Sequence, residues 1–153
     1  MKIADFLTAS RIIPSLKAAD KKGALKEMAD WMAREDPALD ARRLFDTLLE
    51  REKISTTAIG EGVAIPHGKA PGVKQVRGLL ARSSQGVDFD SLDGGLTHLF
   101  FVLVAPEDSA ADHLKALARI SRLLKDSDFR LRLMKEKSGA EIFAVIKEED
   151  GKF

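Results

Sequence analysis

Cysteine is missing from this sequence of 153 residues. Without cysteine the chain has no disulfide bonds, no zinc sites built on thiolates and no cysteine nucleophile. Disulfides belong mainly to oxidising compartments, so a chain without them fits the reducing cytoplasm. We therefore expect a cytoplasmic protein whose chemistry does not use a thiol.

An excess of charge of one sign is also missing. The 25 basic and 24 acidic residues are spread along the chain and leave a formal net charge of +1. No basic stripe is present, so nucleic acid is not an expected partner. No apolar run approaches the roughly 20 residues of a transmembrane helix, and Met1–Asp5 does not begin a signal peptide. We expect no insertion into a membrane.

Several functional motifs are absent as well. The sequence contains no Walker-type phosphate loop, no G-x-S-x-G nucleophile elbow and no H-E-x-x-H zinc motif. The G-x-G at Gly60–Gly62 lacks the third glycine of a dinucleotide fingerprint and precedes a strand, so it is a weak signal. These absences disfavour nucleotide binding, acyl transfer and a metal site. A metal-dependent hydrolase that uses all three histidines is a distant alternative.

The hydrophobic pattern predicts an α/β fold in a single domain that spans residues 1–153. The run His98–Ala105 is apolar after its first residue, which suits a strand in the middle of a sheet covered on both faces. Pro14 cannot donate to a ladder, so the first strand is expected at an edge. Strands are expected at 11–16, 63–65, 76–82, 87–89 and 98–105, and helices at 20–34, 40–53, 109–125, 127–137 and 138–146.

Capping residues mark the starts of these helices. Asp20, Asp40 and Ser138 each precede a predicted helix. Ser109, with Asp112 three residues later, has the spacing of a capping box. The polar C-terminal tail is expected to fray. From the helix that Ser109 opens, the side chains expected to face the core are Leu114, Leu117, Ala118 and Leu124.

The segment Val63–Gly68 holds the strongest candidate for a placed functional side chain. Pro66 fixes its own φ and restricts the residue before it, so the apolar strand Val63–Ile65 is expected to end there. His67 follows at once, and Gly68 permits backbone angles that are closed to other residues. A histidine between proline and glycine has a largely determined backbone, which is how a reactive side chain is aimed.

The histidines favour chemistry at phosphorus. With an ordinary histidine pKa near roughly 6.5, His67 is largely neutral and nucleophilic at cellular pH. His113 lies in the first turn of a predicted helix, where free amides and the helix dipole attract an anion and favour a neutral ring. Phosphoryl transfer requires in-line positioning and stabilisation of spread negative charge, which His113 and Arg51 would supply. His98 is expected to be structural.

These residues lie in motifs that are similar to those of a known family. The chain carries Arg51–Lys53, Ser55–Thr56, the stretch G-x-G-V-A-I-P-H-G at 60–68 and H-L-x-x-L-A-x-I at 113–120. In these motifs it resembles the enzyme IIA domain of the phosphoenolpyruvate:sugar phosphotransferase system, of the fructose/mannitol type, and within that type the nitrogen-regulatory subgroup. The resemblance covers nearly the whole chain.

The resemblance implies a phosphocarrier. His67 would accept a phosphoryl group from a phosphohistidine on an HPr-like carrier protein, and His113 matches the second active-site histidine of the family. Arg51 matches the phosphate-facing arginine, and Ser55 and Thr56 complete the expected phosphate-binding set. The resemblance also implies a mixed sheet of about five strands flanked by helices, no metal or organic cofactor, and regulatory target proteins as further partners.

One residue departs from the family pattern, and alternatives stay open. Thr57 stands where a small residue, often glycine, is expected, so the departure concerns the local loop and not the role of His67. Within the family, the alternative is a sugar-specific IIA protein that passes its phosphoryl group to a IIB protein. From another class, the chain could be a non-catalytic regulatory binding module in which His67 is inert.

Overall fold

The most hydrophobic run of the sequence forms the centre of the sheet. In the computed structural model, which describes residues 1–152, strand β6 (Thr97–Ala105) has neighbours on both sides. It pairs antiparallel with β5 (Arg77–Val87) and parallel with both β3 (Val63–Ala64) and β4 (His67–Lys69). The edges are β1 (Ile12–Ile13), parallel to β5, and β2 (Ala58–Gly60), antiparallel to β3. The predicted mixed sheet is confirmed, with six strands in the described part of the chain.

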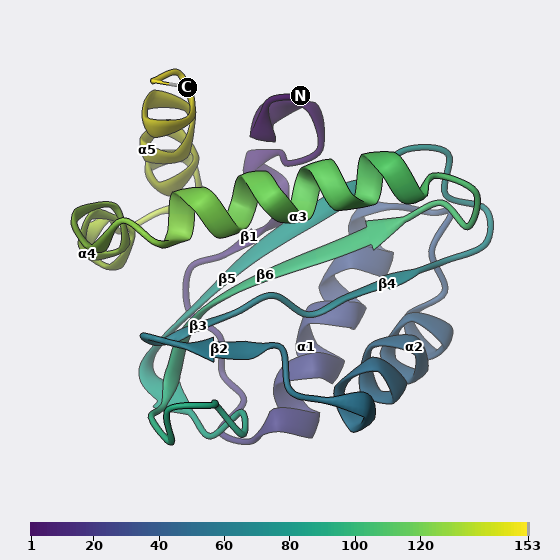
Figure 1. The fold of residues 1–153 in the computed structure, drawn as a ribbon, viewed down its shortest axis with the longest axis horizontal. Helices are drawn as coiled ribbons and strands as arrows, with labels where there is room; N and C mark the ends of the chain where they lie inside the picture. Colours follow the sequence, from purple (N-terminus) through teal and green to yellow (C-terminus); the bar gives the residue numbers. More distant parts are fainter. Residues whose placement is uncertain (153) are drawn as a thin grey trace.

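Helices cover both faces of this sheet (Figure 1). They are α1 (Lys21–Glu35), α2 (Ala41–Ile54), α3 (Ala110–Leu124), α4 (Ser127–Lys135) and α5 (Gly139–Asp150), with the short turns η1 (Ile3–Asp5) and η2 (Ala9–Arg11) near the N-terminus. Helices α1 and α2 pack on one face, and α3, α4 and α5 pack on the other. Among residues 1–152, no helix is long and apolar enough to cross a membrane.

Alternation along β6 explains its continuous apolar sequence. Successive side chains of a strand point to opposite faces of the sheet. One set packs under α3, α4 and α5, and the other packs over α1 and α2. The first set is Leu99, Phe101 and Leu103, the second is Phe100, Val102 and Val104, and all are at most 2% exposed. Each such burial contributes roughly 1.5–3 kcal/mol. The prediction of a central strand covered on both faces is confirmed.

Three of the predicted helix caps form as expected. Asp20, Asp40 and Ser138 each accept a hydrogen bond from the backbone amide three residues further on, at the starts of α1, α2 and α5. The predicted first strand is reduced to Ile12–Ile13, because Pro14 ends its pairing, but it does lie at an edge of the sheet.

Helix α3 departs from its prediction in two ways. Ser109 is its N-cap residue but makes no capping hydrogen bond through its side chain with residues 1–152, so the predicted capping box is wrong. The buried face of the helix also differs from the predicted one. Leu114, which is 67% exposed, and Ala118 lie in solvent, Leu117 is half-buried, and only Leu124 is buried as predicted. Apolar residues occur around much of this helix, so spacing alone does not select one stripe. The residues that face the sheet are His113, Ala116, Ile120, Leu123 and Leu124.

The predicted fraying of the C-terminal tail is also wrong for the described residues. Helix α5 continues to Asp150, and that side chain is buried. Its carboxylate accepts hydrogen bonds from the amide of Ile3 at 2.6 Å and from Nε of Arg119 at 2.5 Å. A long-range contact of this kind stabilises the helix end and is not visible in the local polar sequence.

Candidate functional site

His67 opens a strand that resumes after a proline break. Strand β3 ends at Ala64, and β4 begins at His67, whose Cα lies opposite Leu103 of β6. Pro66 keeps the two strands in line, because its carbonyl accepts a hydrogen bond from the amide of Leu103 at 3.0 Å. The predicted strand end before the proline is confirmed. The sequence does not predict β4, because its pairing depends on β6 and not on local pattern.

Gly68 serves a close approach of helix α2. A Cβ at this position would lie 2.6 Å from Cγ2 of Thr47, which real Cβ atoms essentially never do. The backbone φ of Gly68 does not lie in the left-handed region, so the expected need for unusual backbone angles is wrong. The glycine instead lets α2 pack directly on β4. This packing brings the last turn of α2, which carries Arg51, toward His67.

One hydrogen bond sets the tautomer of His67. Its Nδ1 lies 2.8 Å from the carbonyl oxygen of Ile65. A carbonyl oxygen can only accept, so in the neutral ring Nδ1 carries the proton and donates it. The unshared electron pair then resides on Nε2. The residue is half-buried, and its nucleophilic nitrogen is fixed by the backbone two residues earlier.

His113 lies directly beside His67. The ring centroids are 5.4 Å apart, and the planes cross at 72° in an edge-to-face arrangement. Nε2 of His113 is buried and has no hydrogen-bond partner among residues 1–152. Buried polar atoms normally have partners, so an unpartnered one beside the ring of His67 suits a role toward a bound group. The rotated face of α3 is what brings this ring against the sheet.

Both rings favour the neutral form. Burial lowers the pKa of His67, and the positive charge of Arg51 lowers it further, although the bond to Ile65 and the charge of Glu52 oppose the shift. Burial also lowers the pKa of His113, and the neighbouring His67 and Lys69 add to that shift. The pair is therefore neutral at cellular pH, as nucleophilic chemistry requires.

Two cationic groups act on the histidine pair. Arg51, in the last turn of α2, donates a hydrogen bond from its guanidinium to the carbonyl of Ser55 at 3.0 Å, and its charge acts on His67. Lys69 acts on His113 and was not predicted as a site residue. It follows His67 by two positions on the same strand and so lies on the same face, a signal that becomes readable only once β4 is known.

Ser55 and Thr56 have structural contacts in the loop that follows α2. Ser55 is the exposed C-cap of α2 and receives Arg51 at its carbonyl. The hydroxyl of Thr56 donates to the carbonyl of Phe89 at 2.9 Å and lies 3.1 Å from the amide of Ala58, from which it accepts. These bonds fix the loop that follows α2. A direct phosphate contact from either hydroxyl stays a prediction.

The presence of Thr57 in this loop is explained by its hydrogen bonds to Glu52, a partner that was not predicted from the sequence. Its amide donates to Oε1 of Glu52 at 3.0 Å, and its hydroxyl donates to Oε2 of the same carboxylate. Glu52 is buried and also pairs with Lys21 at 3.1 Å. Thr57 thus replaces the small residue of the family pattern and ties the loop to α2. The local sequence gave no signal for Glu52, which looks like part of a solvated charge run.

His98 is not part of the pair. It lies at the start of β6, with Nδ1 2.8 Å from the carbonyl of Ser83. Leu103, which lies opposite His67, is five residues further along β6, which is about 16 Å at the usual rise per residue. A single metal ion cannot reach all three histidines. In the part of the chain described, no group of three His, Cys, Asp or Glu side chains could hold a metal ion.

Comparison with known proteins now identifies the family. The family described as "Phosphoenolpyruvate-dependent sugar phosphotransferase system, EIIA 2" matches residues 5–149. The chain belongs to this EIIA 2 family. The resemblance seen in the sequence motifs is therefore confirmed.

Members of the EIIA 2 family with different roles are similar to this chain. A nitrogen regulatory protein of Bradyrhizobium diazoefficiens is 47% identical over 146 residues, which cover 95% of each chain. The fructose-specific EIIABC component of Bacillus subtilis is 35% identical over 150 residues, 98% of this chain but 24% of that protein. Among solved structures, the nitrogen regulatory protein IIA-Ntr of Neisseria meningitidis has a TM-score of 0.87 and 34% identity, over 94% of this chain and 98% of that one.

Proposed function

We propose that this EIIA 2 chain is a phosphocarrier of the nitrogen-regulatory branch, which accepts a phosphoryl group on Nε2 of His67 from a phosphohistidine of an HPr-like protein. The single observation that carries the proposal is the histidine pair. Nδ1 of His67 is held by the carbonyl of Ile65 at 2.8 Å, which leaves Nε2 as the nucleophile beside the unpartnered Nε2 of His113.

The transfer step follows from these atoms. The electron pair on Nε2 of His67 attacks phosphorus in line with the donor's phosphorus–nitrogen bond. A new phosphorus–nitrogen bond forms as the old one breaks, and its electron pair returns to the ring of the donor histidine. No metal or co-reactant is required for this balance. The charges of Arg51 and Lys69 and a hydrogen bond from neutral His113 would stabilise the transferred oxygens.

The surroundings of the site favour a protein as the phosphoryl donor. Ile54 is 79% exposed and lies one turn after Arg51, and Leu114 is 67% exposed and follows His113 directly. Exposed apolar side chains beside a catalytic group suit contact with another macromolecule. A phosphoryl group would add up to about two negative charges at this surface, so a regulatory target could distinguish the two states.

The rival function is that of a sugar-specific EIIA, which the fructose-specific relative favours. The decisive measurement loads the chain with labelled phosphoryl group from an HPr-like donor and then offers each IIB protein of the same cell. We expect stable loading, no onward transfer that supports sugar uptake, and target proteins that bind one phosphorylation state only. Rapid transfer to one IIB would establish the sugar-specific role instead. A chain that never loads would be a binding module.

The lowered pKa values predict a pH dependence. Since burial lowers the pKa of His67 and His113, both rings should stay neutral in the folded protein at pH values where a free histidine, with a pKa of about 6.5, is already titrating. The unfolded chain binds more protons in that window, so the free energy of unfolding should fall as the pH falls below about 6.5. Imidazole NMR titrations, with the chain in urea as the control, measure this directly. Titration of folded His67 at or above the urea midpoint would contradict it.

A further inference from the structure

A hollow with a mixed polar and apolar lining lies on the surface away from the histidine pair. Its volume is about 420 Å³, and it is walled by the turn between β2 and β3, by the start of β6 and by helix α4. Leu99, Leu131 and Met134 provide its apolar surface. Glu61, Arg130 and His98 supply its charged and polar groups. None of these three has a role in phosphoryl transfer at His67.

The charged groups of this hollow form an opposed pair. Oε2 of Glu61 lies 2.7 Å from a guanidinium nitrogen of Arg130. The other terminal nitrogen of Arg130 donates a hydrogen bond to the carbonyl of Leu124 at 2.7 Å, which fixes the position of the guanidinium. The Arg130 side chain is 16% exposed. The Glu61 side chain is 73% exposed. The Arg130 side chain is thus held in the wall of the hollow, whereas the Glu61 side chain is largely open to solvent at the rim.

The backbone that carries Glu61 is held in an unusual conformation. Its φ is +57°, and the flanking Gly60 and Gly62 have φ values of +115° and +77°. Left-handed angles are uncommon for a residue with a Cβ and persist where the surroundings impose them. Asp93 imposes this one by accepting from the Glu61 amide at 2.9 Å, and its hydrogen bonds to the amides of Glu61 and Gly95 lower its pKa to about 2. The turn therefore fixes the backbone from which the Glu61 side chain projects.

His98 adds a hydrogen-bond acceptor to the same hollow. Its Nδ1 lies 2.8 Å from the carbonyl of Ser83, so in the neutral ring the proton is on Nδ1 and Nε2 is an acceptor. The ring is half-buried and belongs to the lining of the hollow. An acceptor in the same lining as the Glu61 carboxylate suits a ligand ammonium group, and Arg130 suits a carboxylate.

From this combination we propose that the hollow binds a free α-amino acid with an apolar side chain. The α-carboxylate replaces Glu61 on Arg130, the α-ammonium donates to Glu61 and to Nε2 of His98, and the side chain lies on Leu99 and Met134. Only the Glu61 side of this ion pair is exposed, and the incoming carboxylate takes its place on Arg130, so the arginine is not left without an opposite charge. In the complex, Arg130 pairs with the carboxylate of the ligand and Glu61 pairs with its ammonium group.

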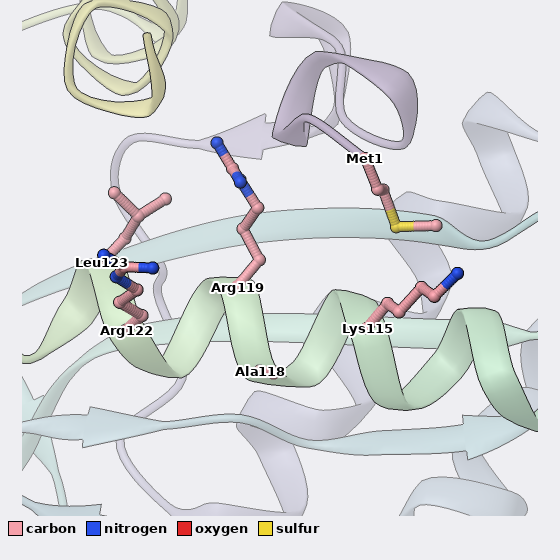
Figure 2. A pocket seen from close by; sticks show the side chains of 6 residues that line it. All are labelled: Met1, Lys115, Ala118, Arg119, Arg122 and Leu123. Carbon is pink, nitrogen blue, oxygen red and sulfur yellow. The ribbon is translucent and has the colours of Figure 1, made fainter. Parts of the chain in front are cut away.

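A different hollow serves as an internal comparison. It has a volume of about 320 Å³, and Figure 2 shows Lys115, Arg119 and Arg122 projecting from α3 into it, with Met1 on the opposite side. Among residues 1–152, no carboxylate belongs to its lining, and Arg119 is already bonded to Asp150 through two nitrogens at 2.5 and 3.0 Å. A ligand that uses only a carboxylate would favour this cationic hollow. A ligand that needs both charges would favour the one beside Glu61.

The experiment titrates the full ¹⁵N-labelled chain with each common protein amino acid at millimolar concentration and follows amide shifts. At least one amino acid with an apolar side chain should give saturable shifts at residues 61–62, 98–99 and 130–134. Its N-acetyl and C-amide forms, each lacking one charge, should bind roughly tenfold or more weakly. Glu61→Gln should weaken binding to a similar extent, whereas Glu35→Gln, an exposed change on α1, should not.

Three results would overturn this site. The first is the absence of saturable shifts at these residues with every amino acid. The second is equal binding of the N-acetyl and C-amide analogues, which would mean that the two opposed charges of the site are not both used. The third is a response confined to residues 115–122 that acetate reproduces. Since the Glu61→Gln spectrum also reports whether the fold is retained, and since loading of His67 is measured separately, failure here leaves the phosphocarrier proposal intact.

Discussion

Replacing His67 by alanine is expected to abolish labelling of the chain by a phosphorylated HPr-like donor. Its Nε2 is the nitrogen that the Nδ1 bond to Ile65 leaves free. The ring lies beside His113, and the charge of Arg51 acts on His67. The charge of Lys69 acts on His113. Removing a nucleophile that forms the covalent intermediate removes the reaction and not a fraction of it. The label on the unaltered protein should be labile in acid and stable in base, as expected of a phosphorus–nitrogen bond.

His98→Ala is the matched control for this loss. His98 has the same bond from Nδ1 to a backbone carbonyl, at 2.8 Å from Ser83, but lies about 16 Å along β6 from the partner of His67. The His98→Ala variant should therefore be labelled to the same extent as the unaltered chain. Full labelling of His67→Ala, or label mapped to any other residue, would reject His67 as the acceptor. Loss of label in both variants would mean that the reaction depends on the sheet as a whole.

Local chemistry explains why the placement of His67 after a strand end could be predicted from the sequence. Pro66 restricts the backbone around it whatever the tertiary context, and the strand before it is a short continuous apolar run. The central strand 98–105 was predictable for a similar reason, since a continuous apolar run must be covered on both faces. In both cases the decisive restriction lies within a few neighbouring residues.

The remainder of the site depends on contacts between distant segments. The face of α3 that buries His113 is selected by the sheet, because apolar residues surround that helix on several sides. Gly68 is required by Thr47 on α2, and Thr57 is anchored by Glu52, which in turn pairs with Lys21. None of these pairings leaves a mark in the local pattern. The same holds for the tail, where Asp150 is stabilised by Arg119 and the N-terminal turn.

His113→Ala is expected to slow phosphoryl transfer without unfolding the protein. Nε2 of His113 has no partner among residues 1–152, so its removal deletes an unsatisfied polar atom together with some packing. A hydrogen bond to a charged phosphoryl oxygen contributes about 1.5–3 kcal/mol, which corresponds to a loss of roughly ten- to a hundredfold in rate or equilibrium. Rapid-quench measurement of loading from the donor gives the rate, and thermal unfolding reports on the fold.

Arg51→Ala should give a loss of similar size, and its control is Lys53→Ala. Lys53 carries the same charge on the same helix end but pairs with Glu50 in solvent, so its removal should leave the rate within about twofold. Arg51→Lys should recover part of the rate, because lysine keeps the charge but lacks the planar fork that grips two oxygens. Unchanged kinetics in both His113→Ala and Arg51→Ala, at unchanged melting temperature, would make the two residues bystanders. If Arg51→Ala slows transfer, Arg51→Lys recovers part of the rate and Lys53→Ala has no effect, then the charge at position 51 acts at the transferred group.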